Sequence, residues 1–137
     1  MNKGTIAALL VAVLVIGAVP YAWTTQEVKP PVDPTIAVLM KKKLEYSQQL
    51  LESLTLNDLP AAGKQAEALL RIRREAGFRV LKTPEYEHWA DSFTTAGEGI
   101  IKASKDNNLE SAKLHYLGLT MACFNCHSYT RDLRKRG

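Results

Sequence analysis

The apolar residues that follow residue 34 recur at the three- and four-residue steps of amphipathic helices. The pattern predicts a first helix over about residues 35–56, with an apolar face of Ile36, Met40, Leu44, Leu51 and Leu54. Lys41, Lys42, Lys43 and Glu45 fall mostly on the opposite side of this helix. Similar faces predict a second helix (Ala62, Ala66, Leu69, Ile72, Ala76) and a third (Tyr86, Trp89, Phe93, Ala96, Ile100), and a fourth helix is expected to run to about Lys135. Four amphipathic helices with short connections pack best as an all-α antiparallel bundle.

Residues that begin and end helices mark the boundaries. Asn57 or Asp58 caps the second helix, with Pro60 in its first turn, and Gly77 is placed as its C-cap. Thr83-Pro84-Glu85 is a strong start signal, because it joins a cap, a first-turn proline and an acid at the positive end of the helix dipole. Asn107 or Asn108 caps the fourth helix.

The N-terminal pattern is that of an exported protein. Lys3 precedes an apolar run from Ile6 to Val19, the arrangement of a secretory signal. Extended through Trp23, the run reaches the length of about 18 residues that just spans a bilayer. Residues 1–23 are therefore read either as a cleaved signal peptide or as an uncleaved membrane anchor, residues 24–34 as a proline-rich linker, and residues 35–137 as the helical domain.

Composition then narrows the function classes. The chain has 18 Lys and Arg against 14 Asp and Glu, a net charge of +4, which favours docking to a weakly acidic surface rather than to nucleic acid. Two cysteines are too few for a disulfide-dense scaffold or for a zinc site made of cysteines alone.

The strongest chemical signal is the segment Cys123-Phe124-Asn125-Cys126-His127, a CxxCH motif. This motif is the attachment signature of c-type haem. At about 100° per residue on a helix, the two thiols and the imidazole share one side, so that the thiols bond the porphyrin edge and His127 reaches the iron. The open alternatives are a dithiol redox pair and a zinc site completed by other ligands such as His88.

A CxxCH motif on the last helix of a four-helix bundle resembles the class II cytochromes c, that is, cytochrome c-prime and the cytochrome c556 type. The tail CFNCHSYTR is similar to the family pattern, with Arg131 in place and Tyr129 one position earlier than the usual aromatic residue. The resemblance covers about residues 35–133 and implies one covalently attached haem c, with its iron held by His127.

The sixth iron ligand separates two functions within this resemblance. The family's c556 type has a methionine early in the first helix and carries electrons, and Met40 is the matching residue here. An apolar residue that does not bind the iron would instead give a c-prime-like protein that binds nitric oxide or carbon monoxide, and Met40 is then part of the core. His88 and His115 are read as surface residues or as residues with other partners.

The resemblance also has implications for the residues that pair with the haem propionates and for the partners of the protein. The family often has Arg four residues before the distal ligand, where this chain has Ile36, so the haem propionates must pair elsewhere; the candidates are Lys41, Arg71, Arg74 and Arg131. The expected role is an electron carrier and not an enzyme, located in the periplasm, serving redox partner proteins. A homodimer through the first two helices stays open, with Ala62 and Ala66 as small contact residues.

Overall fold

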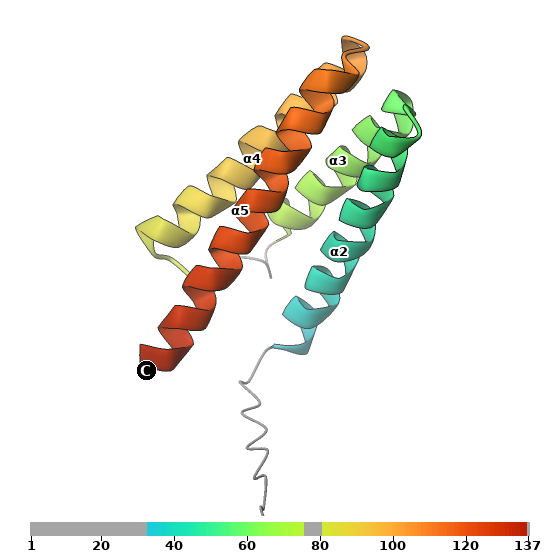
Figure 1. The fold of residues 1–137 in the computed structure, drawn as a ribbon. Coiled ribbons are helices and arrows are strands. Elements are labelled where there is room, and N and C mark those ends of the chain that lie inside the picture. The colour runs from blue at the N-terminus through green and yellow to red at the C-terminus, as the bar shows by residue number, and fades with distance from the viewer. Residues whose placement is uncertain (1–32, 76–80, 137) are drawn as a thin grey trace, which may run out of the picture. The chain divides into compact units, whose positions relative to one another are not determined.

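The computed structural model describes residues 33–75 and 81–136, and this part of the chain is helical, without a strand. Its helices are α2 (Pro34–Thr55), α3 (Leu59–Arg74), α4 (Pro84–Lys105) and α5 (Leu109–Arg136) (Figure 1). The expected all-α bundle is thus confirmed, and the helix boundaries lie within a few residues of those predicted. The signal or anchor segment, most of the linker and the proposed C-cap Gly77 lie outside the described residues.

Each of the first three described helices begins with a side-chain cap followed closely by proline. The carboxylates of Asp33 and Asp58 accept hydrogen bonds from Thr35 N (2.8 Å) and Ala61 N (3.0 Å). Thr83 Oγ1 accepts from Tyr86 N at 3.3 Å. These bonds satisfy backbone donors that have no partner within a first helical turn, which is why the start signals in the sequence were reliable.

Two asparagines make the turns that join α2 to α3 and α4 to α5. Asn57 and Asn107 have positive φ values of 58° and 52°. The following amides, Asp58 N and Asn108 N, donate to the carbonyls of Ser53 and Ala103, each at 2.9 Å or less. This is a Schellman-type ending in which Asn takes the left-handed position that usually holds glycine. Asp58 and Asn108 are therefore the caps, while the asparagines before them end the preceding helices.

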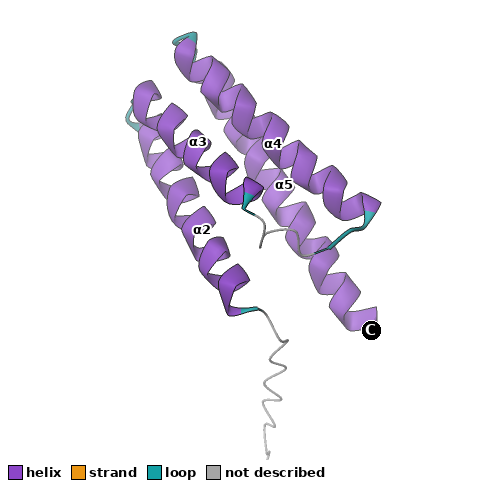
Figure 2. Cartoon of the chain, turned by 180° about the vertical axis from the view of Figure 1, so that it is seen from behind, coloured by secondary structure: helices purple, strands orange, loops and turns teal. Residues whose placement is uncertain are grey.

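Successive helices run in opposite directions, and α2–α3 and α4–α5 form two hairpins (Figures 1 and 2). The interior at the end where these turns lie is closely packed, with wholly buried Leu50, Ala62, Ile100 and Ala112. Gly97 lies against Leu70, and Gly99 lies against His115, so these small residues on α4 allow close helix approach. The opposite end holds the beginnings of α2 and α4 and the ends of α3 and α5.

One prediction about helix faces is wrong. Leu44 and Leu51 belong to the predicted apolar face of α2, but they are 60% and 50% exposed, and Leu39 and Leu50 are buried instead. Ala62 and Ala66 lie on the predicted apolar face of α3, and their complete burial inside the chain confirms that face but does not fit a role as contact residues with a second copy. Among the described residues, no helix is long and apolar enough to cross a membrane.

Candidate functional site

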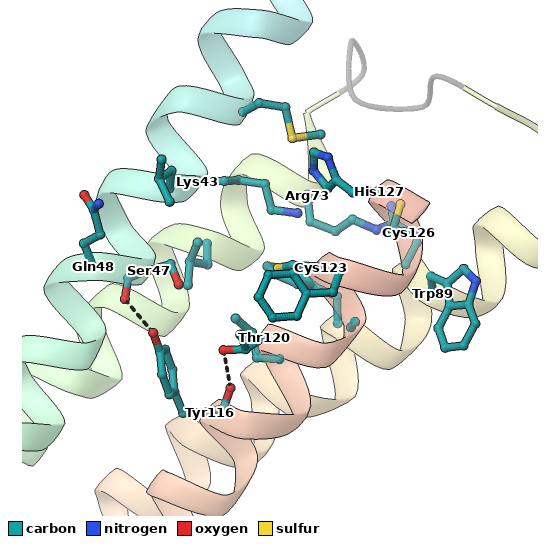
Figure 3. Close-up of a pocket in the computed structure, with 18 of the residues that line it drawn as sticks. Lys43, Ser47, Gln48, Arg73, Trp89, Tyr116, Thr120, Cys123, Cys126 and His127 are labelled. Atoms are coloured by element: carbon teal, nitrogen blue, oxygen red, sulfur yellow. Dashed lines mark hydrogen bonds between the residues drawn. The ribbon is translucent and has the colours of Figure 1, made fainter. Parts of the chain in front are cut away.

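Cys126 and His127 follow Cys123 by about one turn of α5, and all three residues line the same cavity (Figure 3). Both thiols are free and half-buried, while the imidazole is more exposed. The predicted placement of the motif on one side of the last helix is confirmed. Two thiols and one imidazole on a rigid helix can bind a single ligand at three points.

The cavity has a volume of about 590 Å³, within the range of small-molecule and cofactor sites. All four described helices line it. Because successive helices are antiparallel, the first halves of α2 and α4 meet the second halves of α3 and α5 at this end. The cavity therefore collects residues that are far apart in sequence, including Met40, Arg73, Trp89 and Cys123.

The walls of the cavity are mainly apolar. Leu69, Phe93 and Leu119 are buried at its inner side, while Leu44, Leu51 and Phe124 line it with exposed side chains. These last three are 60%, 50% and 61% exposed, unusual values for large apolar residues that converge on one cavity. An apolar ligand bound there would remove this surface from water, which would stabilise the complex by about 25 cal/mol for each Å² of apolar surface buried. The apolar face predicted for α2 thus serves partly as core and partly as cavity wall.

Met40 lies on α2 and lines the same cavity as His127. It is half-buried and packs against the small cluster formed by Leu39 and Ile72. The structure thus brings Met40 and the CxxCH residues to one cavity from two different helices. A thioether and an imidazole are both established ligands of haem iron.

Sequence reasoning missed the cations of this cavity. Lys43 was placed on the outer side of α2, but it lines the cavity, and its Nζ lies 3.7 Å from the ring centroid of Phe93. Arg73 on α3 lines it too, with a side chain only 16% exposed. The sequence did contain a signal for Lys43: residues three apart on a helix share a face, so Lys43 lies on the same side of α2 as Met40. Of the cations proposed from sequence to pair with propionates, only Lys41 lines the cavity.

Burial and charge set the protonation of the site. Burial lowers the pKa of Lys43 to about 8, and the nearby thiols oppose this shift. Burial raises the pKa of both Cys123 and Cys126, which the charge of Lys43 partly offsets. Desolvation, followed by the charges of Lys43, Arg131 and Arg134, lowers the pKa of His127. The imidazole is therefore neutral at pH 7, the form in which a ring nitrogen can bind a metal.

One polar contact joins α5 to α2 beside the cavity. The Tyr116 hydroxyl donates to the Ser47 carbonyl at 3.4 Å, and Thr120 Oγ1 donates to the Tyr116 carbonyl at 2.9 Å (Figure 3). Both Tyr116 and Thr120 line the cavity. The hydrogen bond from Tyr116 therefore joins α5, which carries the two thiols, to α2, which carries Met40.

The other two histidines lie apart from this cavity. His88 is exposed on α4 and makes an edge contact with the Trp89 ring, with centroids 4.6 Å apart. His115 is half-buried against Gly99. Within residues 33–75 and 81–136, no three His, Cys, Asp or Glu side chains gather closely enough to hold a metal ion together.

The donor set of the cavity fits a covalently attached haem. It combines two free thiols, a neutral imidazole, a thioether and apolar walls in one cofactor-sized space. Comparison with family models, with curated proteins and with solved structures finds no match for this chain.

Proposed function

We propose that this protein is a mono-haem c-type cytochrome that transfers electrons, in which His127 and Met40 would bind the haem iron. The observation that carries the proposal is that the CxxCH residues and Met40 line one apolar cavity from α5 and α2. Thioether bonds from Cys123 and Cys126 would hold the haem. When bound, haem supplies reversible one-electron chemistry at its iron.

The residues of the chain have distinct parts in this function. His127 offers an unprotonated ring nitrogen on the thiol-bearing helix, and Met40 offers a soft sulfur from the facing helix, a combination that raises the reduction potential. Leu69, Phe93 and Leu119 exclude water from the inner wall. Because the site is built on helices and not on loops, the side chains need move little when the charge of the ligand changes.

The surroundings of the protein are part of the proposal. The apolar run at the N-terminus supports export, and the CxxCH motif supports a periplasmic location, in which the domain is either soluble or tethered. Arg71, Arg74, Arg131 and Arg134 are exposed on the ends of α3 and α5. These guanidinium groups could bind acidic redox partners, since exposed charges mainly steer association.

Visible spectra of the ferric and ferrous protein, expressed with haem-attachment machinery, test the ligand assignment. The expected spectra are low-spin in both states, with no binding of added carbon monoxide. Met40→Ala should give a high-spin iron that binds carbon monoxide. Met121→Ala, which changes an exposed methionine on α5, is the matched control and should leave the spectra unchanged. A high-spin wild-type protein would instead indicate the gas-binding, c-prime-like alternative.

A further inference from the structure

Large apolar side chains form a stripe along the outer side of α5, here called the apolar stripe. Its members are Leu114, Leu117, Met121 and Phe124, which are 70%, 61%, 55% and 61% exposed. Leu114, Leu117 and Met121 do not line the cavity, so the cavity does not account for their exposure. Single exposed apolar residues are ordinary, whereas several that adjoin on one helix mark an interaction surface.

The spacing of the apolar stripe is that of a helix–helix contact. Its residues follow one another at steps of three, four and three, the heptad pattern in which side chains pack between those of a facing helix. The opposite side of α5, with Ala112, Leu119 and Ala122, is buried, and α5 packs mainly against α4 (Figures 1 and 2). A helix that is apolar on two opposite sides is suited to packing between two neighbours. The spacing therefore indicates another helix as the occupant of the apolar stripe.

The charge pattern favours a second copy of the same helix. No Asp, Glu, Lys or Arg occurs in α5 from Leu114 to Thr130. A surface that binds an acidic protein or an anionic lipid carries complementary charges, which the apolar stripe lacks. An uncharged apolar stripe is instead complementary to itself, as an interface with two-fold symmetry requires.

The ends of α5 determine the relative direction of two such helices. Exposed Arg131, Arg134 and Lys135 follow the apolar stripe, and a parallel pair would bring these basic ends together, where they would repel each other. An antiparallel pair keeps the two basic ends apart. It also brings Glu110, which precedes the stripe and is 82% exposed, toward the basic end of the other copy.

We propose that two copies of this protein associate through α5 in an antiparallel, two-fold symmetric pair. In the heptad register, Leu114 packs against Phe124 of the second copy and Leu117 against Met121 of the second copy. This face is distinct from the first two helices, which the resemblance suggested for a dimer, and the pair does not depend on the proposed haem function. Because each copy contributes only four residues to its apolar centre, we expect a dissociation constant roughly in the micromolar range.

Sedimentation velocity of the purified protein from about 1 to about 500 μM tests the pair. The wild-type protein should pass from monomer to dimer over this range. Leu117→Glu should weaken association at least roughly hundredfold, because it would bury two carboxylates at the centre of the interface. The matched control is Leu56→Glu, which changes an equally exposed leucine (71%) at the end of α2 and should leave association unchanged. Circular dichroism verifies that each variant is helical.

Mixing two variants tests the antiparallel register. Leu117→Glu and Met121→Lys should each be monomeric alone, because each places like charges in the interface. Their mixture should form dimers again, since an antiparallel pair sets the new Glu of one copy against the new Lys of the other and restores Leu117 to Met121 at the second contact. A mixture that stays monomeric would overturn the proposed register.

Three further results would overturn the proposal. A wild-type protein that is monomeric throughout the range does not form the pair. A dimer that persists in Leu117→Glu uses another face of the molecule. A monomer that binds vesicles of phosphatidylethanolamine and phosphatidylglycerol, and loses this binding with Leu117→Glu but not with Leu56→Glu, would identify the apolar stripe as a lipid-binding surface. None of these results bears on whether the chain carries haem, which spectra and mass decide separately.

Discussion

The Tyr129 hydroxyl donates a hydrogen bond of 2.8 Å to Oγ1 of Thr83, the residue that caps α4. Thr83 Oγ1 also accepts from Tyr86 N, so one oxygen both begins α4 and ties it to α5. Tyr129 follows His127 by two residues, and this contact therefore fixes the end of the motif-bearing helix against α4.

The shared oxygen predicts coupling between Thr83 and Tyr129. Thr83→Ala should cost about 1–2 kcal/mol of unfolding free energy through the lost cap, and Tyr129→Phe about 1 kcal/mol through the lost hydrogen bond. The double variant should cost less than the sum, measured by urea denaturation. Asp58→Ala, which removes the cap of α3, should instead add to Tyr129→Phe. Strict additivity of Thr83→Ala and Tyr129→Phe would contradict the shared role of this oxygen.

Two glycines on facing helices should respond to alanine with opposite signs. A Cβ at Gly99 would lie 2.6 Å from Cγ of His115, whereas a Cβ at Gly118 meets only Ala96 Cβ at 3.8 Å. Gly118→Ala should raise the unfolding free energy by up to about 1 kcal/mol through helix propensity. Gly99→Ala should lower it by about 1–3 kcal/mol, because the ring must be displaced. Thermal and urea unfolding measure both, and stabilisation by Gly99→Ala would show that the His115 contact is not tight.

Lys43 should make stability depend on pH in the alkaline range. Burial lowers its pKa from an ordinary 10.5 to about 8, so the unfolded chain binds more protons than the folded chain between these values. Stability should therefore rise with pH through this window, by roughly 1–2 kcal/mol between pH 8 and 10. Below pH 8 both states are protonated, and the full cost of the buried charge persists.

The measurement is urea denaturation of the Cys123→Ala, Cys126→Ala chain with and without Lys43→Met. The alanines are needed because the raised thiol pKa values act in the opposite direction. The chain with Met at position 43 should lack the rise and be the more stable at pH 7. Parallel pH curves for the two proteins would show that Lys43 is not desolvated.

Local chemistry made most of the fold predictable. Thr83-Pro84 and Asp58 with Pro60 act through hydrogen bonds within a single turn, so their effect can be read from a few neighbouring residues. The choice between Asn57 and Asp58 as a cap could not be made, because it depends on which of the two adopts a positive φ in the turn.

The site was predictable where one helix supplies it. The positions of Cys123, Cys126 and His127 on one side of α5 follow from their spacing alone. Lys43 and Arg73 line the same cavity because α2 packs against α3, and spacing along one helix does not reveal this. Leu44 was misplaced for a related reason: an apolar periodicity does not distinguish a core face from the wall of a ligand cavity.

The intact mass of the denatured protein tests the central claim most directly. After expression with haem-attachment machinery, the wild-type polypeptide is predicted to carry the added mass of one haem that survives denaturation. The Cys123→Ala, Cys126→Ala variant should have the polypeptide mass alone. A wild-type chain without this added mass, while a known c-type cytochrome matures normally in the same cells, would contradict the assignment of Cys123 and Cys126 as haem attachment residues.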